Sequence, residues 1–118
     1  MKTILVAEDN DSNYLLMTYI LKKAYQIIRA KNGLEAVEMA DKGGIDLILM
    51  DMKMPGMDGV EATKKIREAH PDLPIVALTA NAFDSDRQTM LEAGCNEFLS
   101  KPVSSEKCLS TIEELIGK

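Results

Sequence analysis

The stretch IDLILMD, residues 45–51, decides the fold of this 118-residue chain. Only Asp46 interrupts its apolar residues, and a short apolar run is typical of a strand covered on both faces of a sheet. The next stretch, MKMPGMDG (residues 52–59), contains Pro55 and Gly56, which indicate an irregular turn. The pattern predicts a buried strand over 45–50 with the carboxylate of Asp51 at its carboxyl end, where open α/β sheets bind ligands.

The composition indicates one globular domain over residues 1–118, without an effector domain, because the chain is 46% hydrophobic and too short for a second module. A net charge of −5, without a Lys/Arg cluster, argues against direct nucleic-acid binding. No run approaches the roughly 20 apolar residues that span a membrane. We also expect no signal peptide, because residues 1–3 lead straight into a predicted strand. Cys95 and Cys108 lack metal-type spacing and are expected to be reduced thiols. These features predict a cytoplasmic protein.

The hydrophobic periodicity alternates between strand and helix along the whole chain. Strands are predicted over residues 3–7, 26–30, 45–50, 74–79 and 96–99. The first predicted helix is capped by Asp11 or Ser12 and runs to about Lys23, and the second is capped by Asn32 and ends near Lys42. Further helices are predicted over about 58–69, 84–93 and 104–116. Five βα repeats with short connections imply an α/β fold, in which a parallel sheet carries helices on both faces.

Polar residues follow four of the predicted strands. Glu8 and Asp9 follow the first, Asp51 the third, Thr79 the fourth and Lys101 the fifth. If the sheet reverses direction beside the first strand, the three carboxylates converge at one crevice. At roughly 6 Å and an effective dielectric constant of about 20, each like-charged pair costs on the order of 3 kcal/mol, which calls for a cation. Oxygen ligands without a nearby His or Cys favour Mg²⁺ over zinc.

These residues resemble the receiver domain of two-component response regulators. The resemblance rests on Glu8-Asp9, on Asp51 within residues 50–59, on Thr79-Ala80, and on Phe98 three residues before Lys101-Pro102. It covers nearly the whole chain, and the run Glu8-Asp9-Asn10 is most similar to receivers of hybrid kinases and stand-alone relay proteins. The resemblance implies a flavodoxin-like (βα)5 doubly wound sheet with strand order 2-1-3-4-5.

The resemblance also implies a set of roles. Asp51 would accept a phosphoryl group, in a Mg²⁺-dependent reaction, from a histidine kinase or a histidine phosphotransfer domain. Asp9, Asp51 and the backbone carbonyl of Lys53 would hold Mg²⁺, with Glu8 acting through water. Thr79 and Lys101 would hold the phosphoryl oxygens, over which the charge of the transfer state is spread. The chain would slowly lose its own phosphoryl group and would act as a switch more than an enzyme.

A switch between Thr79 and Phe98 is implied as well. Thr79 would move toward the phosphoryl group and Phe98 would turn into the space it leaves. This movement would alter the surface of helix four, strand five and helix five, where a downstream protein could bind. Phe98 has no hydroxyl, where many relatives carry Tyr, so the switch would rest on apolar burial. Pro102 is expected to follow a cis peptide bond.

The first predicted helix carries more apolar residues than one core stripe needs. We expect the stripe to consist of Leu16, Met17, Ile20 and Leu21. Tyr14, Leu15 and Tyr19 then remain, and they either pack against the last helix or form an exposed patch. As in relatives, such a patch would dock a histidine phosphotransfer domain or histidine kinase.

Other functional classes fit these residues less well. Residues 9–13 imitate the start of a calcium loop, but Tyr14 stands at the required glycine and Ile20 at the closing acid. A haloacid-dehalogenase-type phosphatase needs a second acid where Lys53 stands, and Asp58 is better explained as a helix cap. A degenerate receiver, which binds partners without being phosphorylated, is the remaining alternative.

Overall fold

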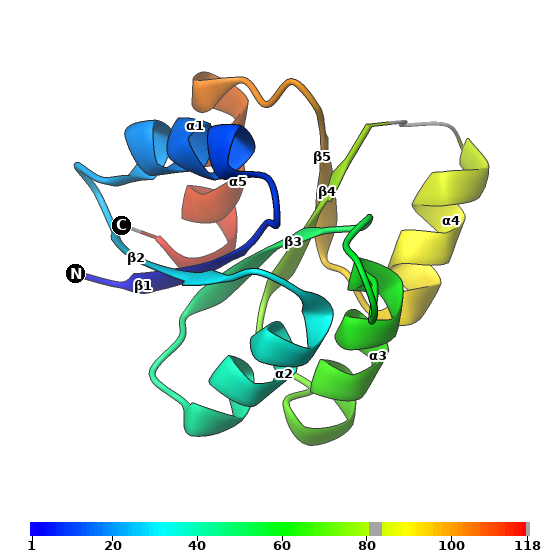
Figure 1. The fold of residues 1–118 in the computed structure, drawn as a ribbon. Helices are drawn as coiled ribbons and strands as arrows, with labels where there is room; N and C mark the ends of the chain where they lie inside the picture. Colours follow the sequence, from blue (N-terminus) through cyan, green and yellow to red (C-terminus); the bar gives the residue numbers. More distant parts are fainter. Residues whose placement is uncertain (81–83, 118) are drawn as a thin grey trace.

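Five parallel strands form a single sheet in the order β2-β1-β3-β4-β5, with helices on both faces (Figure 1). This computed structural model describes residues 1–80 and 84–117. The strands are β1 (Thr3–Ala7), β2 (Gln26–Ala30), β3 (Leu47–Asp51), β4 (Ile75–Thr79) and β5 (Glu97–Ser100). The helices are α1 (Asp11–Leu21), α2 (Gly33–Lys42), α3 (Gly59–Ala69), α4 (Asp84–Ala93) and α5 (Ser105–Ile116). The predicted flavodoxin-like topology is confirmed.

The core lies in two layers because successive side chains of a strand point to opposite faces. Leu5 and Ala7 of β1 pack on the side covered by α2, α3 and α4. Ile4 and Val6 pack on the side covered by α1 and α5 (Figure 1). Every residue of β3 and β4 is buried, which explains the continuous apolar runs in the sequence.

The capping residue of α1 differs from the prediction. Asn10, and not Asp11 or Ser12, caps this helix, since its Oδ1 accepts a hydrogen bond of 3.0 Å from the backbone N–H of Asn13. The helix also ends at Leu21, before the predicted Lys23. Asn32, Asp58 and Ser104 cap α2, α3 and α5 in the same way.

The predicted core stripe of α1 is only partly correct. Met17 and Leu21 are buried and Ile20 packs at the edge of the core, but Leu16 is 44% exposed. Met17 and Leu21, four residues apart, cover the sheet, and Leu16 lies beside the helix face that they form. There it lines a small cavity with Pro102 and Val103.

Candidate functional site

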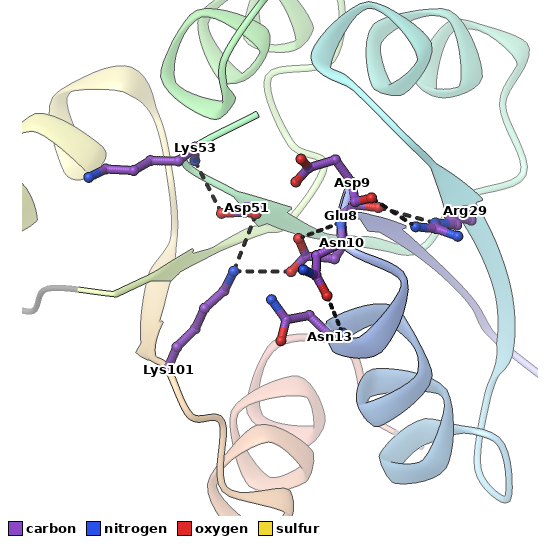
Figure 2. A network of polar contacts seen from close by, with 8 residues as sticks. All are labelled: Glu8, Asp9, Asn10, Asn13, Arg29, Asp51, Lys53 and Lys101. Carbon is purple, nitrogen blue, oxygen red and sulfur yellow. Dashed lines mark hydrogen bonds and ion pairs between the residues drawn. The ribbon is translucent and has the colours of Figure 1, made fainter. Parts of the chain in front are cut away.

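The parallel sheet brings the predicted polar residues to one edge. Glu8 and Asp9 directly follow β1, while Asp51 and Thr79 are the last residues of β3 and β4. Lys101 directly follows β5. The position of β1 between β2 and β3 places the acidic pair beside the end of β3 (Figure 2). The crevice therefore lies at the point where the strand order reverses.

Three carboxylates meet in this crevice. Glu8, Asp9 and Asp51 each offer one oxygen, and these oxygens lie within 4.8 Å of one another. Glu8 is 1% exposed and Asp51 is 5% exposed, whereas Asp9 is exposed, so two of the three carboxylates are removed from water. Buried anions at this spacing require a positive partner. Their hard oxygen atoms fit Mg²⁺, which keeps several waters and needs few protein ligands.

Lys101 supplies positive charge from the opposite side of the crevice. Its Nζ lies 3.0 Å from Oε1 of Glu8 and 3.2 Å from Oδ2 of Asp51 (Figure 2). Burial by itself lowers the pKa of Lys101, but the hydrogen bond to Glu8 and the charge of Asp51 outweigh this, so the pKa is raised overall. Lys101 is therefore a fixed ammonium group at neutral pH.

The pKa of Glu8 is also raised, but here burial is the main cause. Burial, with a further contribution from neighbouring Asp51, raises the pKa of Glu8 to about 7, although Lys101 acts against this shift. Its second oxygen, Oε2, accepts a hydrogen bond of 3.3 Å from the backbone N–H of Asn10. A proton and a metal ion therefore compete for Glu8 near neutral pH.

Lys53 has a backbone contact with Asp51. Its backbone N–H donates a 3.1 Å hydrogen bond to Oδ1 of Asp51, while its side chain points away from the carboxylates (Figure 2). Lys53 and Thr79 line a cleft of about 310 Å³ that also includes Asp58 and Thr89. Asp58 caps α3 through the backbone N–H of Glu61, as expected from its place in the sequence. This cleft gives a small molecule room to approach the edge of the crevice.

Phe98 is half-buried on the side of the sheet that carries α4. The guanidinium of Arg87, from α4, lies 5.2 Å from the centre of its ring. The Lys101–Pro102 peptide bond is cis, the isomer that the resemblance implies. Phe98 thus connects β5, the strand that precedes Lys101, with the surface of α4.

The structure separates the apolar residues of α1 that the sequence grouped together. Tyr14 packs against the core under Arg29, whose guanidinium lies 4.4 Å from the ring centre. Leu15 and Tyr19 are 61% and 75% exposed. Sequence reasoning assigned no role to Arg29, although it contacts the loop that holds Glu8 and Asp9. The available signal was a lone arginine near the carboxyl end of a strand.

The fold and the crevice define a doubly wound α/β domain with an acidic site at its switch point. Residues 4–113 match the family described as the response regulator receiver domain, and the chain belongs to this family. It is therefore a receiver domain of two-component signalling. No helix in the described part of the chain is long and apolar enough to cross a membrane.

Three relatives show how far the similarity extends. The polar-differentiation response regulator DivK of Brucella anthropi is 34% identical over 98% of this chain and 97% of its own length. The receiver domain of a sensor histidine kinase of Pseudomonas aeruginosa has a TM-score of 0.92 and 36% identity, and covers 99% of this chain and 98% of that one. That structure has a magnesium ion coordinated in its active site cleft. A co-crystal structure of the phosphotransfer protein Ypd1 and the Ssk1 receiver domain of Saccharomyces cerevisiae matches with a TM-score of 0.92 and 34% identity, covering 98% and 88% of the two chains.

Proposed function

We propose that Asp51 accepts a phosphoryl group from a phosphohistidine of a histidine kinase or a histidine phosphotransfer protein. The observation that carries this proposal is the position of the Lys101 ammonium group beside Asp51, within a cluster of three carboxylates. A carboxylate oxygen of Asp51 forms a bond to phosphorus while the bond from phosphorus to the donor nitrogen breaks. The donor imidazole keeps that electron pair, and an acyl phosphate remains on Asp51.

The other residues of the crevice have supporting roles in this proposal. Asp9, Asp51 and the backbone carbonyl of Lys53 hold Mg²⁺, with Glu8 acting through water. The bound ion supplies charge neutralisation for the phosphoryl oxygens. Lys101 and the hydroxyl of Thr79 bind the same oxygens from the protein side. The chain changes only itself, by gaining and slowly hydrolysing the acyl phosphate, and so acts as a switch.

The output surface is proposed to be that of α4, β5 and α5. Thr79 moves toward the added charge, and Phe98 turns into the space that Thr79 leaves. Phe98 contacts α4 through Arg87, so its movement changes the shape of that surface. A downstream protein that prefers the changed surface then binds the phosphorylated form more tightly.

The phosphodonor is proposed to dock on α1 beside the crevice. Leu15 is one of the exposed apolar residues of this helix, and Tyr14 borders it at the core edge. The similarity to the receiver that was crystallised with Ypd1 supports a partner of the phosphotransfer type. Two free, buried cysteines, Cys95 and Cys108, fit a reducing compartment, and we place this exchange in the cytoplasm.

Intact mass after incubation with Mg²⁺ and acetyl phosphate tests the proposal. We expect a gain of one phosphoryl group that disappears in Asp51→Asn and in the presence of EDTA. A purified phosphohistidine partner serves as the second donor. No gain from either donor would indicate a receiver that only binds partners, and a gain that persists in Asp51→Asn would mean that another residue is the acceptor.

A further inference from the structure

Arg29 is hydrogen-bonded to the loop that carries two of the three carboxylates. Its Nε donates a 3.1 Å hydrogen bond to the backbone carbonyl of Glu8, and its Nη2 donates a 3.3 Å hydrogen bond to the backbone carbonyl of Asp9 (Figure 2). Arg29 belongs to β2, on the side of β1 away from Asp51. Arg29 therefore contacts the loop of Glu8 and Asp9 from β2, whereas Asp51 lies on β3 at the other side of β1.

Arg29 is itself held in place by two further contacts. Its Nη2 lies 2.9 Å from Oδ1 of Asp11, and its guanidinium lies over the ring of Tyr14. Its side chain is only 18% exposed. A planar guanidinium donates to two acceptors in a fixed geometry, which a lysine ammonium cannot reproduce.

The backbone of Glu8 is thereby fixed at both of its polar groups. Its carbonyl accepts from Arg29, and its N–H donates a 3.0 Å hydrogen bond to the carbonyl of Ala30. Both contacts come from the end of β2. Because the two carboxylates stand on this short piece of backbone, their spacing to Asp51 depends on β2 as well as on β1 and β3.

We infer that Arg29 is a positioning residue for the metal site, which presets the Glu8 and Asp9 carboxylates to receive Mg²⁺. It touches the backbone of the ligand loop and does not touch the reacting atoms. This inference rests on the proposed Mg²⁺ site. Ligands that are already in position bind an ion more tightly, because their side chains and backbone lose less conformational entropy when the ion binds.

The direction in which Mg²⁺ affinity changes when Arg29 is replaced distinguishes positioning of the loop from a purely electrostatic effect. Arg29 carries a positive charge close to the carboxylates, so its charge alone opposes the binding of a divalent cation. If only charge matters, Arg29→Met tightens Mg²⁺ binding and Arg29→Lys leaves it unchanged. If Arg29 positions the loop, both variants weaken Mg²⁺ binding, and Arg29→Lys weakens it less because one hydrogen bond can still form.

The experiment compares calorimetric Mg²⁺ titrations of the whole chain with amide hydrogen exchange of the metal-free protein. We expect Arg29→Met to weaken Mg²⁺ binding about tenfold, which corresponds to about 1.4 kcal/mol. We also expect exchange at the Glu8 amide to accelerate about tenfold without metal. Lys31→Met is the matched control, since Lys31 is exposed, directly follows β2 and loses the same charge when it is replaced. Both quantities should be unchanged in this control.

Each contrary result has a distinct meaning. Unchanged or tighter Mg²⁺ binding in Arg29→Met, with the wild type binding normally, would overturn the inference. A wild-type chain that binds no Mg²⁺ would instead overturn the proposed metal site, and the exchange measurement would still show whether Arg29 holds the loop. If Arg29→Met unfolds, Arg29→Lys provides the same comparison, and unchanged affinity there would overturn the inference.

Discussion

The ammonium nitrogen of Lys101 lies 3.0 Å from Oε1 of Glu8, although the two residues are 93 positions apart in the sequence. This contact places one cation among three carboxylates that together suit a metal ion. Lys101 therefore has two opposing effects, because it competes electrostatically with Mg²⁺ and also offers charge to a phosphoryl group.

Replacement of Lys101 by methionine should separate these two effects. We expect Lys101→Met to bind Mg²⁺ several-fold more tightly, since a competing positive charge is gone. The rate of phosphorylation by acetyl phosphate should nevertheless fall about 100-fold, because one preorganised charge is lost from the transfer state. Calorimetry and intact mass measure the two quantities. Lys64→Met, an exposed site on α3, is the control, and a parallel loss of rate in it would argue against a specific role.

Magnesium affinity should depend on pH through Glu8. With a pKa of about 7, this carboxylate is mostly protonated at pH 6 and mostly ionised at pH 8. Since a proton must leave before the group can act as an anion, the affinity should be about tenfold lower at pH 6 than at pH 8. Titration calorimetry at the two pH values measures the difference. Equal affinities would show that Glu8 is not linked to metal binding.

The raised pKa of Glu8 also affects the stability of the metal-free protein. Folding raises the pKa of Glu8 from 4.5 to about 7, so the folded state holds this proton more tightly than the unfolded state does. The contribution of Glu8 to stability is thus complete below pH 4.5 and is lost as the pH rises to about 7. Urea unfolding across this pH range should show that the free energy of unfolding of the wild type falls as the pH rises, and that this fall is absent in Glu8→Gln.

The ring of Phe98 should be released when Arg87 is changed. A cation–π contact at an exposed site contributes about 0.5–1 kcal/mol, so Arg87→Gln should shift the ratio of outward to inward Phe98 about two- to fivefold toward the inward position. Fluorine NMR of the chain labelled at its two phenylalanines, assigned with Phe98→Leu, measures this ratio. Arg87→Lys keeps a cation and should shift the ratio less. An identical shift in both variants would exclude the cation–π explanation.

Gly59 is required where α3 begins against the end of β3. A Cβ at this position would meet the backbone oxygen of Asp51 and would lie 2.7 Å from Cα of Met52. We expect Gly59→Ala to displace Asp51, lowering stability by about 1–3 kcal/mol and slowing phosphorylation. Gly44→Ala is the matched control, because its φ of 81° strains the backbone while its surroundings are open. Slow phosphorylation in both variants would mean that lost stability alone explains the effect.

Leu15 should matter only for the phosphodonor protein. Leu15→Asp places a charge on the exposed part of α1, so transfer from a phosphohistidine partner should fall at least tenfold while acetyl phosphate still reacts normally. Leu34 on α2 is similarly exposed, at 56%, and Leu34→Asp is the control. Transfer at the wild-type rate in a folded Leu15→Asp protein would place the docking surface elsewhere.

Much of the fold and of the crevice could be predicted from local patterns. The buried run before Asp51, the polar residues at the ends of four strands, and the caps Asn32 and Asp58 follow from periodicity and short-range hydrogen bonding. The exposure of Leu16 could not be predicted in this way. Helical spacing gives the direction of a side chain, whereas the width of the covered face depends on how α1 lies against the sheet.

The sequence by itself determined that five strands alternate with five helices, and that Glu8, Asp9, Asp51, Thr79 and Lys101 stand at strand ends. Tertiary structure alone decided which of those ends meet. Strand β1 lies between β2 and β3, and this order brings Glu8 and Asp9 to Asp51 and brings Arg29 to the backbone that holds the acidic pair. Lys101 follows β5, two strands beyond β3 in the sheet, and its side chain reaches across to Glu8. Such contacts leave no local pattern in the sequence, because they arise from the pairing of strands that are distant along the chain.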